Sequence, residues 1–273
     1  MSATAKPSAK LTAASLRARK GTGQRTVFLT AYDVVFARLA DEAGIDAVLV
    51  GDSMGMVVQG ERSTLGVTVD DVVYHSRIVS RGISRAHLVA DMPFMSYQAS
   101  VEDGMRAAGR LIKEGNAEAV KLEGGEEVAE LTRRLVRAGI PVVGHVGLTP
   151  QSIHQIGGFK VQGRTDAQRA KVLADARAVS EAGAYAVVLE AIPHALAGEI
   201  SKSIEALTIG IGAGADCDGQ VMVMHDLLGL QPSWKPRFVR RYAELGKAAG
   251  EAFAAYAADV RAGKFPSREE TYE

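Results

Sequence analysis

The sequence predicts an α/β protein with the fold of a (β/α)8 TIM barrel, for three reasons. Short aliphatic runs alternate with amphipathic helical segments, and the interval between runs is roughly one strand, one helix and two loops. Acidic or imidazole side chains lie at the ends of these runs, namely Asp52, Asp91, Glu123, His145 and Glu190. Eight such alternations favour a closed barrel over an open doubly wound sheet. Because all strands of a barrel end on one face, we expect these side chains to converge there.

The composition restricts the possible classes of protein. A chain of 273 residues fits one barrel, and 32 acidic residues balance 32 basic ones, so nothing indicates a surface for nucleic acid. Cys217 is the single cysteine, which excludes an intrachain disulfide and suits a reducing cytoplasm. No apolar run approaches the roughly 18 residues of a membrane span. We expect a cytoplasmic protein without nucleic-acid or membrane partners.

The predicted domain organisation is a tail with a short helix over residues 1–24 and a single barrel domain over 25–273. Basic residues without any acid mark the first 25 positions, a composition shared with organelle transit peptides: Lys6, Lys10, Arg17, Arg19, Lys20 and Arg25. The preferred interpretation is a frayed tail followed by a helix near 11–20 that plugs the barrel floor. The transit peptide is the alternative.

The first half of the barrel shows four strands and clear helix signals. The strands are 27–30, the runs that end at Asp52 and Asp91, and the run that contains Lys121 and Glu123. Thr68 and Ser100 are predicted N-caps with Asp71 and Asp103 at N3, and Gly44 and Gly115 end helices. Since strand side chains alternate, Lys121 and Glu123 share one face and Leu122 faces the helices.

The second half shows the other four strands and a long terminal helix. Strand five runs from Pro141 to His145, and Thr149 and Pro150 open a short helical piece. Residues 157–164 have three glycines and no periodicity, which predicts a mobile loop before a helix over 166–181. The remaining strands end at Glu190, near 212 and at His225-Asp226. Apolar residues three or four apart predict the last helix: Phe238, Tyr242, Leu245, Ala249, Phe253, Tyr256 and Val260.

Asp52 and Asp91 are the candidate metal ligands. An Asp after a strand often caps the following helix instead. Two such residues, with Glu123 one strand further on, favour a cation that relieves the repulsion among three carboxylates. So few carboxylates, without a His-x-x-His cluster, favour Mg²⁺ with retained waters over zinc.

Four other residues are candidates for chemistry or binding. Lys121 is either one half of a buried ion pair with Glu123, a point charge for a substrate carboxylate or enolate, or a Schiff-base lysine. Glu190 has no basic neighbour in sequence, which suits a general base. His145 either supports that base or fills space with a hydrogen bond, and Ser53 can donate to an anion. The glycines of 210–214 favour close backbone approach to a ligand.

Eight segments together resemble the ketopantoate hydroxymethyltransferase family, from about Leu11 to the last helix. They are Leu29-Thr30-Ala31-Tyr32-Asp33, Val50-Gly51-Asp52-Ser53, Ala90-Asp91-Met92-Pro93-Phe94, Val120-Lys121-Leu122-Glu123-Gly124-Gly125, Gly144-His145-Val146-Gly147-Leu148-Thr149-Pro150-Gln151, Leu189-Glu190, Ile209-Gly210-Ile211-Gly212-Ala213-Gly214 and Val223-Met224-His225-Asp226-Leu227-Leu228-Gly229. One departure is Ala206, where the family often has a proline that opens strand seven.

The resemblance implies a barrel of the phosphoenolpyruvate mutase and isocitrate lyase type. It implies transfer of a one-carbon unit from 5,10-methylenetetrahydrofolate to 3-methyl-2-oxobutanoate, giving 2-dehydropantoate on the route to pantothenate. By match, Asp52 and Asp91 take the Mg²⁺ positions and Glu123 the associated acidic position. Ser53 and Lys121 join the two aspartates in contacting the oxo acid, and Glu190 accepts the proton. It also implies a homo-oligomer, typically a decamer.

Two rival functions remain open. One is a metal-dependent carbon–carbon lyase of the same superfamily, disfavoured because Cys217 follows strand seven and no cysteine lies near the ends of strands four and five. The other is a non-catalytic barrel that senses an oxo acid or a folate. Lys160 and Arg164 either fold over a bound substrate or lie in a solvated loop.

Overall fold

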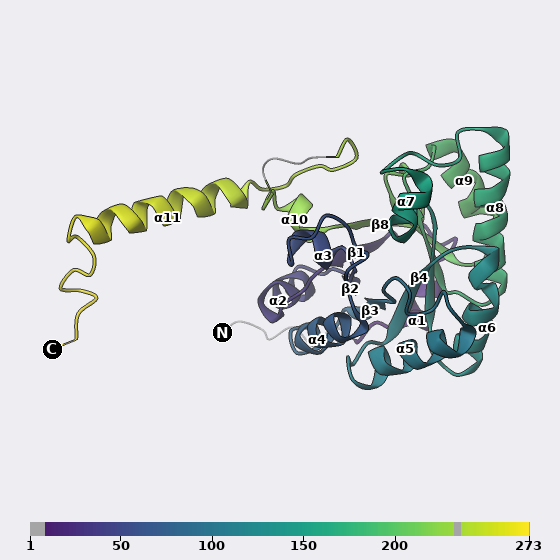
Figure 1. Cartoon of the computed structure of the whole chain (residues 1–273), viewed down its shortest axis with the longest axis horizontal. Coiled ribbons are helices and arrows are strands. Elements are labelled where there is room, and N and C mark those ends of the chain that lie inside the picture. Colours follow the sequence, from purple (N-terminus) through teal and green to yellow (C-terminus); the bar gives the residue numbers. More distant parts are fainter. Residues whose placement is uncertain (1–8, 232–235, 273) are drawn as a thin grey trace. The chain divides into compact units, whose positions relative to one another are not determined.

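The computed structural model describes residues 9–231 and 236–272, and its central feature is a closed barrel of eight parallel strands in sequence order. Each strand pairs with its neighbours along the chain, and β1 closes the barrel on β8. Figure 1 shows helices around these strands. The strands are β1 Thr26–Thr30, β2 Ala47–Val50, β3 His87–Asp91, β4 Ala119–Glu123, β5 Val142–Gly147, β6 Ala186–Glu190, β7 Leu207–Ile211 and β8 Gly219–Met222. The predicted (β/α)8 TIM barrel is confirmed.

The helices follow the strands as the alternation predicts. They are α1 Ala13–Arg17, α2 Val34–Glu42, α3 Met54–Val57, α4 Val69–Ser80, α5 Val101–Lys113, α6 Ala129–Arg137, α7 Ile153–Ile156, α8 Asp166–Glu181, α9 His194–Ser203, α10 Met224–Leu227 and α11 Leu245–Arg261, with 3-10 turns η1 Glu126–Val128 and η2 Pro150–Ser152. The N-caps Thr68 and Ser100 accept main-chain hydrogen bonds from Asp71 and Asp103, as predicted.

Two apolar clusters fill the barrel and its shell. The outer cluster joins strand residues such as Leu122 and Leu189 to the surrounding helices. The inner cluster includes Phe28 and Val143, and Leu16 of α1 belongs to it with no exposed surface. The helix predicted near 11–20 is therefore confirmed over Ala13–Arg17, and its leucine contributes to the core inside the barrel. Lys6 lies outside the described residues.

Four predicted boundaries were wrong in the structure. β2 ends at Val50, so Asp52 follows the strand by two residues, and β5 continues past His145 to Gly147. His225 and Asp226 lie in α10 instead of ending a strand, because the chain turns helical at Met224. α11 begins at Leu245, so the apolar residues Phe238 and Tyr242 precede it.

By compactness the chain divides into two units, Met1–Met222 and Val223–Glu273. Inside the second unit, the main-chain N–H groups of Tyr242 and Leu245 donate to the carbonyls of Leu227 and Leu228, at 2.8 and 2.9 Å. Helix α11 buries none of its side chains within the described residues. A search of the described residues finds no helix long and apolar enough to cross a bilayer.

Candidate active site

The predicted site residues gather at the carboxyl ends of β2 to β6. Asp91, Glu123 and Glu190 are the last residues of their strands, and His145 lies within β5. The register places Asp91 beside Lys121 and Glu123 beside His145. Five of these side chains belong to residues that are at most 6% exposed: Asp52, Asp91, Lys121, Glu123 and His145. The Glu190 side chain is 15% exposed and so more open to solvent.

Asp52 and Asp91 form a buried acidic pair. The main-chain N–H of Asp52 donates to Oδ2 of Asp91 at 3.0 Å. Burial, together with the negative charges of Asp91 and Glu123, raises the pKa of Asp52 well above its ordinary value. Burial also raises the pKa of Asp91, against the attraction of Lys121, whose Nζ lies 3.1 Å from Asp91 Oδ1. The positive charge of Lys121 therefore does not fully offset the burial and mutual repulsion of the two carboxylates.

His145 connects the basic and acidic sides of the mouth. Its Nε2 lies 3.1 Å from Glu190 Oε2, and its Nδ1 lies 3.5 Å from Glu123 Oε1 and 3.1 Å from Lys121 Nζ. Burial and Lys121 lower the His145 pKa, but the two carboxylates outweigh them and raise it to about 9. A neutral ring would accept from Lys121, whereas the charged ring favoured at neutral pH faces Glu123 and Glu190. His145 therefore contacts both carboxylates, Glu123 and Glu190, and a supporting role in catalysis stays a prediction.

Gln151 is a site residue that we did not predict. It lies in η2, directly after Pro150, and its Nε2 donates to Asp52 Oδ2 at 2.9 Å and to the Met92 carbonyl at 3.0 Å. Its main-chain N–H donates to Glu123 Oε2 at 2.9 Å, and Tyr97 donates to its Oε1 at 2.8 Å. Gln151 therefore fixes two of the predicted acidic side chains at once. The sequence signals were the Thr149-Pro150 cap next to it and its place at the end of the segment 144–151 that resembles the family.

Ser53 lies beside the acidic pair and pairs with a tyrosine that we also assigned no role. The Tyr32 hydroxyl and Ser53 Oγ are 2.8 Å apart. Burial raises the pKa of Tyr32, so this hydroxyl stays neutral and can orient the serine. Ser53 is the N-cap of α3 but makes no side-chain capping bond there.

The acidic residues do not form a set of three metal ligands. Among the described residues, no three His, Cys, Asp or Glu side chains are arranged to hold one ion. Gln151 and His145 both approach the Glu123 carboxylate, and a metal role for Glu123 stays a prediction. Asp52 and Asp91 together still fit a hard cation such as Mg²⁺, which commonly takes one or two carboxylates and keeps several waters.

The glycine segment 210–214 has a packing explanation. A side chain at Gly210 would lie 3.0 Å from Cys217 Sγ, and one at Gly214 would lie 2.6 Å from His194 Cβ. At Gly214, with its φ of +86°, a side chain is excluded without any ligand, and at Gly210 a side chain fits only if its neighbours shift. Close approach of this segment to a ligand stays a prediction. Lys160 and Arg164 lie in the segment between α7 and α8, where the structure shows no helix or strand, and their closing over a substrate stays a prediction.

Solved structures of low sequence identity share the fold. A phosphonopyruvate hydrolase in complex with oxalate and Mg²⁺ matches with a TM-score of 0.63 at 15% identity, covering 95% of this chain and 93% of that one. A 2,3-dimethylmalate lyase, a member of the PEP mutase/isocitrate lyase superfamily, matches with a TM-score of 0.60 at 19% identity, covering 95% and 91%. These matches support the barrel alone.

Sequence comparison identifies the family. The family model for ketopantoate hydroxymethyltransferase matches residues 10–268. The 3-methyl-2-oxobutanoate hydroxymethyltransferase of Syntrophotalea carbinolica is 56% identical over 261 residues, covering 96% of this chain and 98% of its own. That of Moorella thermoacetica is 53% identical over 264 residues, covering 97% and 98%. This chain is an enzyme of the ketopantoate hydroxymethyltransferase family.

Proposed function

We propose that the enzyme transfers the methylene carbon of 5,10-methylenetetrahydrofolate to C3 of 3-methyl-2-oxobutanoate, with one water, giving 2-dehydropantoate and tetrahydrofolate in pantothenate biosynthesis. The observation that carries the proposal is the Glu190–His145 pair, which shares a mouth with the Asp52–Asp91 pair. The names of the relatives, at 51–56% identity, support the oxo acid and the hydroxymethyl product. The donor, the cation and the residue roles are our inference.

Asp52 and Asp91 would hold a divalent cation, with Mg²⁺ the best match to their chemistry. When bound, such an ion draws electron density from the keto and carboxylate oxygens of the substrate and so stabilises an enolate. The raised pKa of Asp52 supports this assignment, because a cation would offset both the burial and the repulsion from Asp91 and Glu123 that raise it. Glu123 acts indirectly, through its hydrogen bond from Gln151 and its approach to His145.

The remaining residues bind the oxo acid and move its proton. Lys121 supplies a fixed positive charge for the substrate carboxylate, since Asp91 and Glu123 raise its pKa against burial and keep it charged. Ser53 donates its hydroxyl to the same anion. Glu190 takes the proton from C3. The resulting carbanion forms a bond to the methylene carbon as the bond from that carbon to one folate nitrogen breaks, and that nitrogen takes up a proton. Water then replaces the second folate nitrogen on the same carbon, which supplies the hydroxyl group of the product, protonates that nitrogen and releases tetrahydrofolate. His145, with its pKa near 9, stabilises the Glu190 carboxylate through their 3.1 Å contact.

Proton exchange without folate tests this proposal. Wild-type enzyme with Mg²⁺ and 3-methyl-2-oxobutanoate in D₂O should exchange the C3 proton, as followed by NMR. Glu190→Gln should abolish exchange while substrate and metal still bind, and Glu181→Gln, at the end of α8, should not. Normal exchange in Glu190→Gln would remove Glu190 as the base. A wild-type enzyme that binds the oxo acid without exchange would favour the sensor, and cleavage of di-acids would favour the lyase.

A cytoplasmic location and a homo-oligomer, typically a decamer, belong to the same proposal. The family resemblance supports the oligomer. The single cysteine, Cys217, is reduced and buried in the structure, which suits the reducing compartment.

A further inference from the structure

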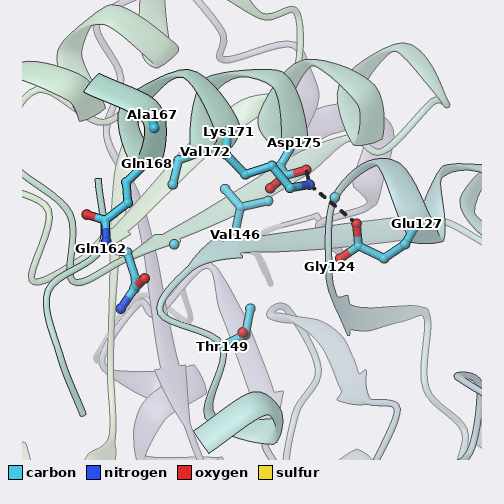
Figure 2. Close-up of a pocket in the computed structure, with 12 residues that line it drawn as sticks. Gly124, Glu127, Val146, Thr149, Gln162, Ala167, Gln168, Lys171, Val172 and Asp175 are labelled. Carbon is cyan, nitrogen blue, oxygen red and sulfur yellow. Dashed lines mark hydrogen bonds and ion pairs between the residues drawn. The ribbon is translucent and has the colours of Figure 1, made fainter. Parts of the chain in front are cut away.

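A second cavity lies outside the mouth, between α8 and the loops that follow β4 and β5 (Figure 2). Its volume is about 370 Å³, within the usual range for small-molecule sites. None of the roles assigned above uses the side chains that line it. The function of this cavity therefore needs a separate explanation.

Backbone contacts connect this cavity to the reacting end of the barrel. Gly147, which lines the cavity, is in register with Glu190, and the next residue, Leu148, donates its N–H to the Glu190 carbonyl at 2.9 Å. Gly124, on another wall, donates to the His145 carbonyl at 3.0 Å. The walls of the cavity are thus hydrogen-bonded to the main chain of Glu190, the proposed base, and of His145, directly or through the next residue.

One end of the cavity is rich in negative charge. Lys171 Nζ lies 2.5 Å from Asp175 Oδ1, 3.5 Å from Glu126 Oε2 and 3.7 Å from Glu127 Oε2. Asp175 also accepts from the Glu126 main-chain N–H at 3.2 Å, which leaves Glu127 the least engaged carboxylate of the three. Three carboxylates around one ammonium favour a ligand with N–H donors and repel a ligand with carboxylates.

The middle of the cavity suits a flat ring. Val146 of β5 and Val172 of α8 both point into it in Figure 2, and both are buried. At Gly125 a side chain would lie 1.9 Å from Asp175 Oδ1, so the Asp175 side chain packs directly against the main chain there. The two valines and the charged group of Lys171 and Asp175 therefore line one cavity.

We propose that this cavity binds the 2-amino-4-oxopteridine end of the folate donor. This inference rests on the proposed function. The exocyclic amino group and the ring N–H next to it donate to Glu127, the ring carbonyl accepts from Lys171, and Val146 and Val172 cover the ring face. The glutamate tail of the folate, which is anionic, extends away from the acidic end. This orientation leaves the bridging methylene on the side of Gly147 and the mouth.

Two variants of α8 test the cavity directly. Lys171→Met removes the donor to the ring carbonyl, and Ala167→Trp narrows the space, while Arg177→Met and Ala170→Trp make the same replacements at exposed positions that do not line it. Calorimetric titration with tetrahydrofolate should show affinity about tenfold weaker for Lys171→Met, the effect of losing one hydrogen bond to a charged group. Ala167→Trp should weaken it at least as much, and the two controls should match the wild type.

The folate-free exchange assay separates this inference from the proposed function. Exchange of the C3 proton should be unchanged in Lys171→Met and Ala167→Trp, because the oxo acid binds in the mouth. Unchanged affinity for tetrahydrofolate in both variants would overturn the cavity assignment and leave the exchange chemistry intact. Equal weakening in the two control variants would overturn it as well, since the effect would then not depend on the cavity.

Discussion

Replacing Gln151 with Leu should destabilise the protein by more than the loss of its hydrogen bond to Asp52 alone, because several other hydrogen bonds are lost with it. Leucine has a similar volume but removes the side-chain hydrogen bonds that Gln151 makes with Asp52, Met92, Tyr97 and Gln98, at 2.9, 3.0, 2.8 and 2.9 Å. The bond to the Asp52 carboxyl is worth about 1.5–3 kcal/mol and each of the three neutral bonds about 1 kcal/mol, so the free energy of unfolding should fall by about 4–6 kcal/mol. The main-chain bond from residue 151 to Glu123 does not depend on the side chain and should persist.

Urea unfolding and the exchange assay together measure this prediction. Displacement of the Asp52 side chain should also slow C3 exchange by about 10²-fold at saturating substrate, since small misplacements of catalytic groups have effects of that size. Gln98→Leu is the matched control, because Gln98 donates a single bond to Gln151 Oε1 at 2.9 Å and should cost only about 1 kcal/mol. If Gln151→Leu and Gln98→Leu had equal unfolding midpoints and exchange rates, Gln151 would not organise the acidic residues.

Two further predictions concern the barrel floor. Burial raises the pKa of Asp46, but hydrogen bonds from Arg19 and Arg85 contribute to holding it below its ordinary 3.8. The ionised Asp46 carboxylate therefore stabilises the fold fully above pH 3.8, and this contribution is lost as the pH falls through the folded-state pKa. Asp46→Asn should therefore lower stability by about 1–3 kcal/mol at pH 7, and denaturant midpoints should converge with the wild type below about pH 4; a constant gap would contradict this. Leu16→Ala should lower the free energy of unfolding by about 3–5 kcal/mol in the same assay, because Leu16 is fully buried. Leu39 is 54% exposed, so Leu39→Ala should cost under about 1 kcal/mol. Similar losses in the two variants would argue against α1 as a plug.

Local patterns were sufficient to predict the barrel and the strand ends that bring the candidate site residues together. Strand alternation and cap chemistry involve residues within a few positions of one another, so the ends of β3, β4 and β6 were predicted correctly at Asp91, Glu123 and Glu190. Closure of the barrel then brings those ends together without any further information in the sequence. The same reasoning gave Lys121 and Glu123 one common face.

Residues whose partners are distant in sequence could not be predicted this way. Gln151 contacts Asp52 across 99 positions, and Tyr97 contacts Gln151 across 54. Tyr97 lies in the irregular segment between β3 and α5, and Gln151 lies in the short turn η2. A polar side chain in such a segment is usually solvated, so no sequence pattern placed either one in the interior. Only the folded loops show that these two side chains are buried.

The wrong boundaries near the end of the chain have a related cause. An apolar stripe at helical spacing continued back to Phe238, but α11 begins at Leu245, and its N-cap Glu244 makes no side-chain capping bond. Without a capping signal, periodicity alone does not locate the first turn. At His225 the short α10 replaces a predicted strand end, since four residues are too few for a helical period to be visible.

The acidic residues of the mouth lie in two different electrostatic environments. This difference explains how carboxylates in one mouth can serve two different purposes. On one side, Asp52 and Asp91 are buried close together, and burial raises the pKa of both. Lys121 opposes this only in part, so the pair gains from an added cation. On the other side, His145 with a pKa near 9 places a positive charge 3.1 Å from Glu190, which is compensated before any ligand binds. This difference in surroundings supports our proposal that carboxylates hold a metal on one side of the mouth and that a carboxylate accepts the proton on the other.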